Sequence, residues 1–403
     1  MNILFLTMNI FTDIEMHNIY SDLMKRFIKQ GHHPYIATPR EEKSGEKTSL
    51  IDHGDYHLLK VRVGNINGVS FIKKGISTVF MEERFRKAVK KYLTDVQFDL
   101  ILYSTPPVTF SSVIKYIKAR DNAKTYLLLK DIFPQNAVDI GILNKDGLKG
   151  VVYKYFRRKE KQLYAISDHI GCMSKANIDY LLKNNPYINK DKVEVCPNSI
   201  EVRDIFVSDE ERAGIRRKYG IPENKIVFVY GGNLGKPQDV PYIVECLKLL
   251  EKNERVFFVI AGSGSEKVGL QDYIIESKPG HVKLIPMLEK CEYDRLVACC
   301  DVGLIFLDHR FTIPNFPSRM LTYMQARLPV LAATDPVTDI GQAIIEGGFG
   351  WWCESDRPEN FTEAISAICS LDSLEECGGR SMNYLRDHYS VSKAFKIINM
   401  SLK

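Results

Sequence analysis

Apolar, strand-like runs alternate with amphipathic, helix-like runs through both halves of this 403-residue chain. The strand-like segments are 3–8, 98–103, 125–130 and 169–172 in the first half, and 225–231, 256–261, 301–307 and 329–333 in the second. Such alternation is typical of βαβ units, whose parallel strands are covered by helices. In the first unit Met16, Ile19, Leu23 and Phe27 follow a helical spacing, which predicts a helix that ends at Gly31.

The strand pattern is interrupted near residue 200. A charged stretch follows 196–200 and continues to 220–224, after which a new series of strand-like and helix-like segments begins. A chain of this length is expected to form two domains, at roughly 100 to 200 residues each. We therefore predict an α/β protein with two doubly wound, Rossmann-like domains that face each other across a cleft. In such sheets, ligands bind beyond the carboxyl ends of the strands.

Composition excludes several other classes of protein. Apolar residues make up 45% of the chain and charged residues 26%, which argues against disorder, collagen-like repeats and coiled coil. The nine cysteines are odd in number and show no Cys-x-x-Cys spacing, which favours reduced thiols over disulfides or a zinc site. The first residues lack the features of a signal peptide, and no apolar run reaches the roughly 18 residues of a membrane span. These features predict a cytoplasmic protein that is not integral to a membrane.

Charge is distributed unevenly between the halves. Residues 1–200 contain 31 Lys and Arg against 21 Asp and Glu, whereas residues 201–403 contain 24 against 29. The cations gather in the segments 84–93 and 149–164, where aromatic residues are interleaved with them. Basic helices of this kind suit an anionic membrane surface, so we expect a peripheral contact there, although a solvated helix face with its aromatics in the core explains them equally. The acidic second half and the lack of a binding module argue against nucleic acid.

Two loops that follow strand-like segments of the second half are rich in small residues. The first loop contains Gly232, Asn233, Gly235 and Lys236, and the second contains Gly262 and Ser263. Glycines let backbone N–H groups approach phosphate oxygens, and a lysine adds a cation at the same place. A tight strand-to-helix turn explains either loop alone, but two loops on successive strands fit a nucleotide better.

A third segment, 308–324, contains the start of a helix. Pro317 and Ser318 are typical of a helix N-terminus, so the N–H groups of Ser318, Arg319 and Met320 are expected to point into the cleft beside the Arg319 guanidinium. A helix N-terminus with an arginine is an anion site. An ordinary capped helix with a surface arginine is the alternative.

The order of these motifs resembles the donor half of retaining GT-B glycosyltransferases of the large family-four class. The motifs are Gly-Asn-Leu-Gly-Lys, then Gly-Ser-Gly-Ser-Glu, then the strand-like segment 301–307, then Pro-Ser-Arg before Tyr-Met and a Pro-Val strand. The similarity covers most of the chain and is greatest to the branch that includes the L-fucosamine transferases of O-antigen and capsule assembly. It implies an acceptor-binding domain at 1–203, a donor-binding domain at 204–385, and a helix at 386–403 that crosses back onto the first domain.

The resemblance also implies roles for individual residues. Lys236 and Arg319 would bind the donor diphosphate and stabilise it as it leaves, with the N–H groups of Ser318 and Arg319 on the distal phosphate. The remaining residues implied in donor binding are Gly232, Asn233, Gly235, Gly262, Ser263, Pro286, Met287, Asn315, Pro317 and Thr322. Gly262 and Ser263 would lie along the nucleoside, and the backbone at Pro286 and Met287 would contact the base. The chain departs from the family's E-x(7)-E motif, because Pro314 and Thr322 occupy its glutamate positions, so the usual carboxylate on the ribose is absent.

Acceptor-binding candidates lie in the first half. Lys130 and Asp131 follow the segment 125–130 and resemble the Asp-x-Trp-Pro-Glu segment of the same branch. Asp131 is the acidic candidate for receiving the acceptor proton or orienting its hydroxyl, although capping of the next loop explains it equally. Thr12, Asp13 and His17 lie in the first loop, where acceptor binding and helix capping are both compatible with the residue types.

The activity implied is metal-independent, retaining transfer of a hexosyl or N-acetylaminosugar group from a UDP-sugar to a saccharide, such as a polyprenyl-diphosphate-linked glycan of a capsule or O-antigen. The chain has no Asp-x-Asp motif and no His/Cys cluster, so neither a metal nor another cofactor is expected. Two alternatives are a nucleotide-sugar-binding partner with little or no turnover and a GT-B nucleotide-sugar epimerase. A nicotinamide oxidoreductase is disfavoured because the loop at Gly262 lacks the Gly-x-Gly-x-x-Gly pattern.

Overall fold

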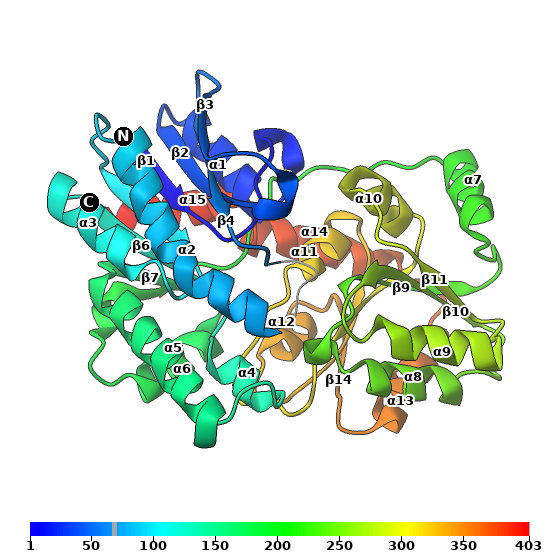
Figure 1. The fold of residues 1–403 in the computed structure, drawn as a ribbon. Helices are drawn as coiled ribbons and strands as arrows, with labels where there is room; N and C mark the ends of the chain where they lie inside the picture. Colours follow the sequence, from blue (N-terminus) through cyan, green and yellow to red (C-terminus); the bar gives the residue numbers. More distant parts are fainter. Residues whose placement is uncertain (67–70, 403) are drawn as a thin grey trace. The chain divides into compact units, whose positions relative to one another are not determined.

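The computed structural model describes the backbone of residues 1–66 and 71–402 and the side chains of 1–66 and 77–402. It divides the chain into two compact units. Unit 1 is Met1–Ile200 with Val391–Lys403, and unit 2 is Glu201–Ser390 (Figure 1). Each unit contains one sheet with helices packed against it, and each is described by itself below.

The sheet of unit 1 has the order β3-β4-β2-β1-β5-β6-β7-β8 among the described residues. Its strands are β1 (Asn2–Leu6), β2 (His33–Glu41), β3 (Ser49–Asp52), β4 (His57–Val63), β5 (Leu100–Ser104), β6 (Lys124–Leu129), β7 (His169–Cys172) and β8 (Val193–Val195). Within this order β3 pairs antiparallel with β4, and the other pairs are parallel. The winding direction reverses between β1 and β5, and ligands of doubly wound sheets bind at the carboxyl ends of strands at such a point.

The helices of unit 1 are α1 (Ile19–Lys29), α2 (Phe71–Tyr92), α3 (Ser111–Asp121), α4 (Gln135–Asp139), α5 (Gly147–Ile166), α6 (Lys175–Asn184) and α15 (Val391–Ser401). Short 3₁₀ turns are η1 (Ile14–Met16), η2 (Glu42–Ser44) and η3 (Lys190–Lys192). The side chain of Asn18 caps α1 by accepting from the N–H groups of Tyr20 and Ser21. Met16 was expected in this helix but lies in η1, because His17 takes a φ of 51° and separates the two.

The sheet of unit 2 has the order β11-β10-β9-β12-β13-β14 among the described residues, with all neighbouring strands parallel. Its strands are β9 (Ile226–Asn233), β10 (Val256–Ser263), β11 (Val282–Ile285), β12 (Val302–Phe306), β13 (Val330–Thr334) and β14 (Gly350–Glu354). The winding direction reverses between β9 and β12. The expected fold class, two Rossmann-like α/β domains with parallel sheets, is confirmed.

The helices of unit 2 are α7 (Asp209–Tyr219), α8 (Val240–Leu249), α9 (Lys267–Ser277), α10 (Lys290–Ala298), α11 (Arg319–Gln325), α12 (Ile340–Glu346), α13 (Pro358–Cys369) and α14 (Glu375–His388), with the 3₁₀ turn η4 (Lys236–Gln238) after β9. Nowhere in the described ranges is a helix both long enough and apolar enough to cross a bilayer.

The C-terminal helix α15 belongs to the core of unit 1. Phe395 and Ile398 are buried against α1, and the ring centroids of Phe395 and Phe27 lie 5.0 Å apart. The N–H of Val391 donates to the carbonyl of Ile200, which joins the two places where the chain leaves and re-enters this unit.

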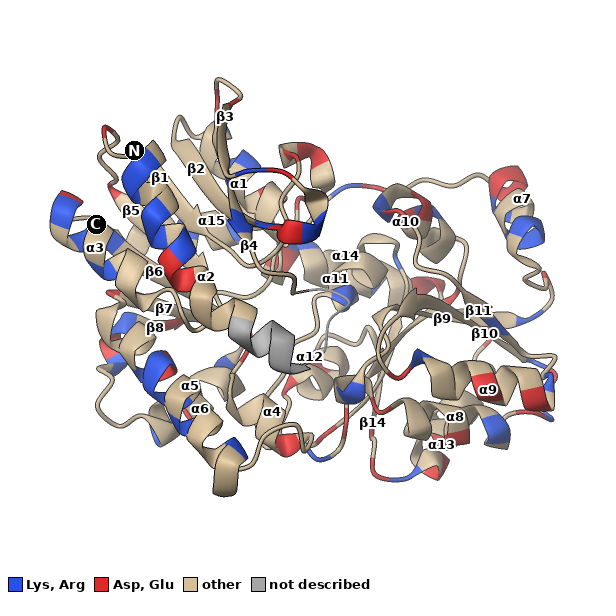
Figure 2. Ribbon diagram, in the orientation of Figure 1, with Lys and Arg blue, Asp and Glu red and all other residues tan. Residues whose placement is uncertain are grey.

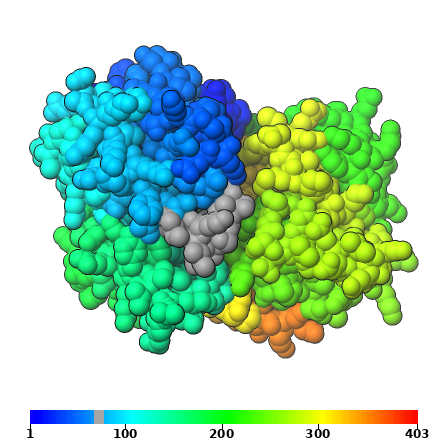
Figure 3. All heavy atoms as spheres, viewed as in Figure 1, coloured from blue at the N-terminus to red at the C-terminus, as the bar shows by residue number. Residues whose placement is uncertain are grey.

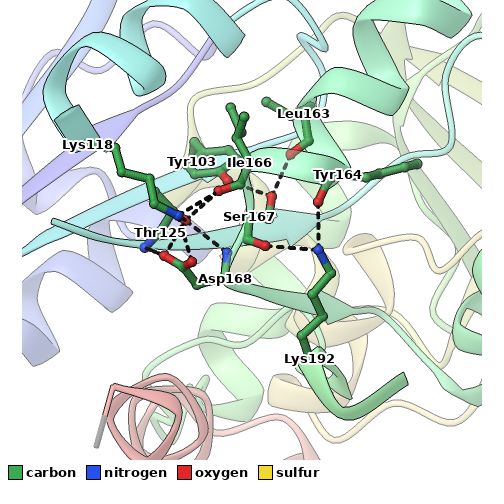
Figure 4. Close-up of polar contacts among 9 residues, drawn as sticks. All are labelled: Tyr103, Lys118, Thr125, Leu163, Tyr164, Ile166, Ser167, Asp168 and Lys192. Atoms are coloured by element: carbon green, nitrogen blue, oxygen red, sulfur yellow. Dashed lines mark hydrogen bonds and ion pairs between the residues drawn. The ribbon is translucent and has the colours of Figure 1, made fainter. Parts of the chain in front are cut away.

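Two lysines secure the C-terminal end of α5 (Figure 4). The ammonium group of Lys118 donates to the carbonyl of Ile166 and to Asp168, and that of Lys192 donates to the carbonyls of Tyr164 and Ser167. Cations stabilise the exposed carbonyls at a helix C-terminus. The last turn of α5 is therefore fixed to α3 and to the segment before β8.

The nine cysteines are free thiols, and eight of them are buried. The exception is Cys291, which is exposed near the start of α10.

Candidate functional site

The two small-residue loops of unit 2 lie side by side because β9 and β10 are paired to their ends. Gly232 is in register with Gly262, and Asn233 with Ser263. A Cβ atom on Gly262 would lie 2.1 Å from the carbonyl oxygen of Gly232, so only glycine allows this close approach. The result is an edge of closely packed backbone at the carboxyl ends of two strands.

The loop after β9 is ordered by a side chain that the sequence analysis did not identify. The side-chain oxygen Oε1 of Gln238 accepts from the Asn233 side-chain amide at 2.9 Å and from the Gly235 N–H at 3.2 Å. Lys236 lies between these residues and is exposed, and its ammonium group has no ion pair with any described residue. The loop therefore presents an uncompensated cation at the end of β9.

Arg319 is the first residue of α11 and lies beside the same loop. Its guanidinium carbon is 4.4 Å from the centre of the Tyr230 ring, and a Cβ on Gly232 would lie 3.7 Å from its Nη2 atom. The Tyr230 hydroxyl donates to the carbonyl of Asn233, so this ring is itself fixed. The Nη1 atom is buried and has no hydrogen-bond partner within the described chain. Leaving a buried guanidinium nitrogen unpaired costs free energy, which an anionic ligand would recover.

Two further tyrosines pack beneath the end of β9. A Cβ on Gly231 would lie 1.8 Å from the Tyr293 hydroxyl. The Tyr293 ring, which comes from α10, therefore occupies the space that a side chain at position 231 would need. The Tyr323 hydroxyl accepts from the N–H of Gly231 and donates to the carbonyl of Leu304. These contacts connect α10 and α11 to β9 and β12.

The start of α11 differs in one detail from the expectation. The helix begins at Arg319 with Ser318 as its N-cap residue, but the N–H of Met320 donates to the carbonyl of Pro317 at 3.3 Å. The expectation that the Met320 N–H is available to a ligand is therefore wrong, because the first turn closes tightly on Pro317. The N–H groups of Ser318 and Arg319 make no hydrogen bond within the described residues.

The other predicted donor-binding residues lie at or after the ends of β10 and β11, or in and before α11. Ser263 is exposed at the end of β10, and its hydroxyl lies 3.9 Å from the sulfur of Met287. Met287 follows Pro286, directly after the neighbouring strand β11. Asn315 is held by the Thr338 hydroxyl, and Thr322 lies one helical turn beyond Ser318.

Asp131 follows β6 in unit 1 and is held by several groups. The Asn136 amide donates to both carboxylate oxygens at 2.8 Å, and the Thr105 hydroxyl donates to the Asp131 carbonyl at 3.0 Å. Burial raises the pKa of Asp131 to about 6, against the hydrogen bonds from the Ile132 N–H and Asn136, which lower it. Asp131 therefore keeps its proton to a higher pH than an ordinary aspartate does, a perturbation that is common at functional sites.

The remaining acceptor-binding candidates lie at the same edge of the sheet. Burial lowers the pKa of Lys130 to about 8. Thr12 and Asp13 are exposed after β1, and the Asp13 side chain accepts from the N–H of Glu15, which caps η1. His17 is partly buried at the end of η1. Because β5 alone separates β1 from β6, the residues that follow these two parallel strands lie at the same edge of the sheet.

Two family models match the chain, one in each half. Residues 211–378 match "Glycosyl transferases group 1", and residues 18–204 match "Glycosyltransferase Family 4". Each half of the chain thus matches the model of a glycosyltransferase domain. The group 1 domain contains the glycine loops and Arg319, and the family 4 domain contains Asp131.

Similar proteins include two curated relatives. The probable glycosyltransferase WbjE of Pseudomonas aeruginosa is 27% identical over 321 residues, which cover 79% of this chain and 77% of the relative. The putative colanic acid biosynthesis glycosyl transferase WcaI of Escherichia coli (strain K12) is 21% identical over 248 residues, which cover 60% of this chain and 59% of the relative. The resemblance to glycosyltransferases is confirmed, whereas the L-fucosamine transferase branch stays a prediction.

Solved structures with the same fold cover nearly the whole chain. HepE of Anabaena matches with a TM-score of 0.70 at 13% identity, over 100% of this chain and 99% of that one. Sucrose-phosphate synthase of Thermosynechococcus elongatus matches with a TM-score of 0.73 at 13% identity, over 99% and 98%. The predicted GT-B fold is therefore confirmed.

The group 1 domain also contains a group of side chains with metal-ligand chemistry. The ligand atoms of Asp239, Asp308 and His309 lie within 4.8 Å of one another. Arg310 donates to both carboxylate oxygens of Asp308, however, and so occupies the position that a cation would take. Burial and the Asp308 carboxylate raise the pKa of Asp239. The expectation of a metal-independent site stays a prediction.

Several residues that shape these two domains were missed from the sequence. Tyr230, Tyr293 and Gln238 support the glycine loop, and Asn136 supports Asp131. Gln238 follows Gly235 by three residues, a capping-box spacing that could have identified it. The tyrosines carry no local signal, because their roles depend on which strands become neighbours.

Proposed function

We propose that the protein is a retaining glycosyltransferase that moves a sugar from a UDP-sugar to a saccharide acceptor carried on a polyprenyl diphosphate. The observation that carries this proposal is the buried, unpaired Nη1 atom of Arg319 beside the glycine loop that presents Lys236. The choice of UDP is supported by HepE, which was solved in complex with UDP and with UDP-glucose. The name of WcaI, a putative colanic acid biosynthesis enzyme, supports a polysaccharide acceptor.

In this proposal the donor diphosphate lies at the start of α11. Lys236, Arg319 and the free N–H groups of Ser318 and Arg319 stabilise the charge that develops on it as the anomeric bond breaks. Gly262 and Ser263 lie along the nucleoside, and Pro286 and Met287 contact the base. Two cations and a helix N-terminus would supply this stabilisation without a metal ion.

The acceptor hydroxyl would attack the anomeric carbon on the face that the diphosphate leaves. The bond from this carbon to the phosphate oxygen breaks, the bond to the acceptor oxygen forms, and the acceptor proton passes to the leaving phosphate. Asp131 would orient the hydroxyl, with Lys130, Thr12, Asp13 and His17 binding the rest of the acceptor. Attack from the same face retains the anomeric configuration, and no covalent enzyme nucleophile is needed.

Calorimetry with UDP, GDP, ADP and dTDP tests the donor site. We expect UDP to bind, and Lys236→Ala to weaken its binding by about 1.5 to 3 kcal/mol, because a charged hydrogen bond to phosphate is lost. Lys252→Ala is the matched control, since Lys252 is another exposed lysine of unit 2, outside the proposed site. Equal UDP affinity in the wild type and Lys236→Ala would remove Lys236 from the site, and binding of none of the four nucleotides would contradict the proposal.

A nucleotide-sugar-binding protein without turnover is the second candidate. It is favoured by Pro314 and Thr322, which leave the ribose without the usual carboxylate. Incubation with UDP-sugars and isolated lipid-linked saccharides separates the two, because the transferase releases UDP only when an acceptor is present.

A further inference from the structure

The N-terminal half of α5 exposes an apolar strip. Leu148 is 91% exposed and Val151 66%, and Val152 and Tyr155 are exposed as well. Val151 and Val152 lie three and four residues after Leu148, and Tyr155 lies four and three residues after them, so the four residues share one side of the helix. Phe156 and Leu163 of the same helix are buried instead. We call the strip of Leu148, Val151, Val152 and Tyr155, with the cations named next, the α5 face.

Three unpaired cations flank the strip. Lys149, Lys154 and Arg158 are exposed and form no ion pair with any described residue. Their neighbours differ, because Arg157 pairs with Glu160 at 2.5 Å and Lys159 pairs with Glu82 at 2.6 Å. Glu160 is the single acidic residue of α5 and is buried. Figure 2 shows Lys and Arg along α5 with little negative charge beside them.

Helix α2 is linked to α5 by an ion pair and exposes two apolar side chains of its own. Lys159 lies one turn after Tyr155 on the same side of α5, and its partner Glu82 lies one turn after Val79 on α2. Val79 and Phe80 are both exposed, Phe80 by 60%. In Figure 3, the teal and green atoms of the chain around α5 form part of the outer surface of unit 1.

The α5 face belongs to a firmly held helix. Its last turn is anchored by Lys118 and Lys192, as Figure 4 shows. Towards its start, a Cβ on Gly150 would lie 2.5 Å from the carbonyl oxygen of Lys145, so the preceding turn packs directly against the helix. The strip therefore exists as a formed surface before any partner binds.

We propose that the α5 face docks on an anionic lipid bilayer. The four apolar side chains would enter the interfacial region, and Lys149, Lys154 and Arg158 would contact lipid phosphates. A second copy of the chain fits less well, since a symmetric contact through this face would bring like cations together. The α5 face is established by its own contacts, whereas the choice of a bilayer as partner rests in part on the proposed lipid-linked acceptor.

Co-sedimentation with vesicles tests the proposal. The full-length protein is mixed with vesicles of phosphatidylcholine alone or with added phosphatidylglycerol, and the bound fraction is measured. We expect binding to the anionic vesicles only, weakened by salt. Removing all three cations should weaken it on the order of 100-fold, at about fivefold per cation. The substitutions are Lys149→Gln, Lys154→Gln and Arg158→Gln, and a second variant carries Leu148→Ser, Val151→Ser and Val152→Ser.

Matched controls remove the same residue types from unit 2. The apolar control carries Val268→Ser and Ile275→Ser on α9, where both side chains are exposed. The cationic control carries Lys252→Gln, Lys278→Gln and Lys283→Gln. Both controls should bind anionic vesicles as the wild type does, and loss of binding in the α5 variants alone supports the α5 face.

Three results would overturn the proposal. The first is equal vesicle binding by the wild type and both α5 variants, and the second is a wild-type protein that does not bind anionic vesicles. The third is a wild type that sediments as a dimer while the variant with Leu148→Ser, Val151→Ser and Val152→Ser sediments as a monomer. UDP calorimetry on the same proteins keeps the two proposals apart. UDP binding without vesicle binding refutes only the α5 face, and vesicle binding without nucleotide binding refutes only the donor site.

Discussion

Arg319 shows how a single residue acquires a function from its surroundings. Its guanidinium group is stacked on Tyr230 and lies against Gly232, and one of its nitrogens has no partner within the described chain. Stacking on an aromatic ring attracts a cation but does not satisfy its hydrogen bonds. The residue is therefore held in place while part of its donor capacity stays open, an arrangement that suits reversible binding of an anion.

Asp131 gives a prediction at the same scale. Its pKa is raised to about 6 by burial, so the folded protein holds this proton more tightly than the unfolded chain does. The free energy of unfolding should consequently decrease as pH rises from about 4 to about 6, and stay lower above that range. Asparagine cannot ionise, so the free energy of unfolding of Asp131→Asn should rise by up to about 3 kcal/mol relative to that of the wild type across this pH range, for a carboxyl pKa raised from its ordinary value to about 6.

Denaturant unfolding of the two proteins at a series of pH values measures this difference. Other carboxylates titrate in both proteins and cancel in the comparison. A gap between the two stability curves that does not change with pH would show that the Asp131 carboxyl titrates at its ordinary pKa in the folded protein.

At the scale of helices and strands, the sequence predicts the strands that are buried on both faces of a sheet and misses strands that are not. Strands such as β9, β10 and β12 are continuous apolar runs, and their positions follow from the sequence. β2 contains two prolines, β4 alternates cations with apolar residues, and β14 is only partly buried, so none has this signal. Their pairing depends on neighbours that are distant in the sequence.

The candidate site was accessible to sequence reasoning only where its elements are local. The glycine loops and the start of α11 are short motifs with a direct physical meaning. The support that Tyr293 gives to Gly231 arises from packing between α10 and β9, which no short motif encodes. The hydrogen bond from the Met320 N–H to the Pro317 carbonyl likewise depends on the conformation of the folded turn.

Gly262 gives a prediction for the paired ends of β9 and β10. Gly262→Ala should destabilise unit 2 by about 1 to 3 kcal/mol, because its Cβ would lie 2.1 Å from the Gly232 carbonyl oxygen and must displace that strand. UDP affinity should fall as well, since the loop that carries Lys236 moves. Thermal unfolding and calorimetry measure the two effects.

Gly269→Ala on α9 is the matched control. A Cβ there meets no atom within 4 Å, and alanine favours a helix, so its stability should equal or exceed the wild type by up to about 1 kcal/mol. If Gly262→Ala and Gly269→Ala show the same unfolding temperature, the close approach of β9 and β10 does not require glycine at position 262.

At the scale of the whole molecule, the chain leaves unit 1 at Ile200 and returns at Val391 to complete it. Unit 1 is therefore assembled from both ends of the chain, with unit 2 inserted between them. The apolar residues of α1 that α15 covers, Phe27 among them, lack their full packing until the last residues are in place. Folding of unit 1 consequently requires contacts between residues that are more than 350 positions apart, such as Phe27 with Phe395.

Phe395 gives the prediction for this arrangement. Phe395→Ala should lower the stability of unit 1 by about 3 to 5 kcal/mol, the cost of a cavity left by a buried aromatic ring. Met400→Ala is the control, because Met400 is exposed on the same helix and its loss should cost little. Denaturant unfolding followed by circular dichroism reports both. Equal midpoints for the two variants would show that α15 adds no stability to unit 1.

The distribution of thiols offers a practical route to observing the site at work. Eight of the nine cysteines are buried, and the exposed one, Cys291, precedes Tyr293 by two residues on α10. Reagents that attack accessible thiolates should therefore modify the wild-type protein at one natural position. A fluorescent dye attached there would sit on the helix that supports the glycine loop, and its emission could follow nucleotide arrival and departure in real time without any engineered residue.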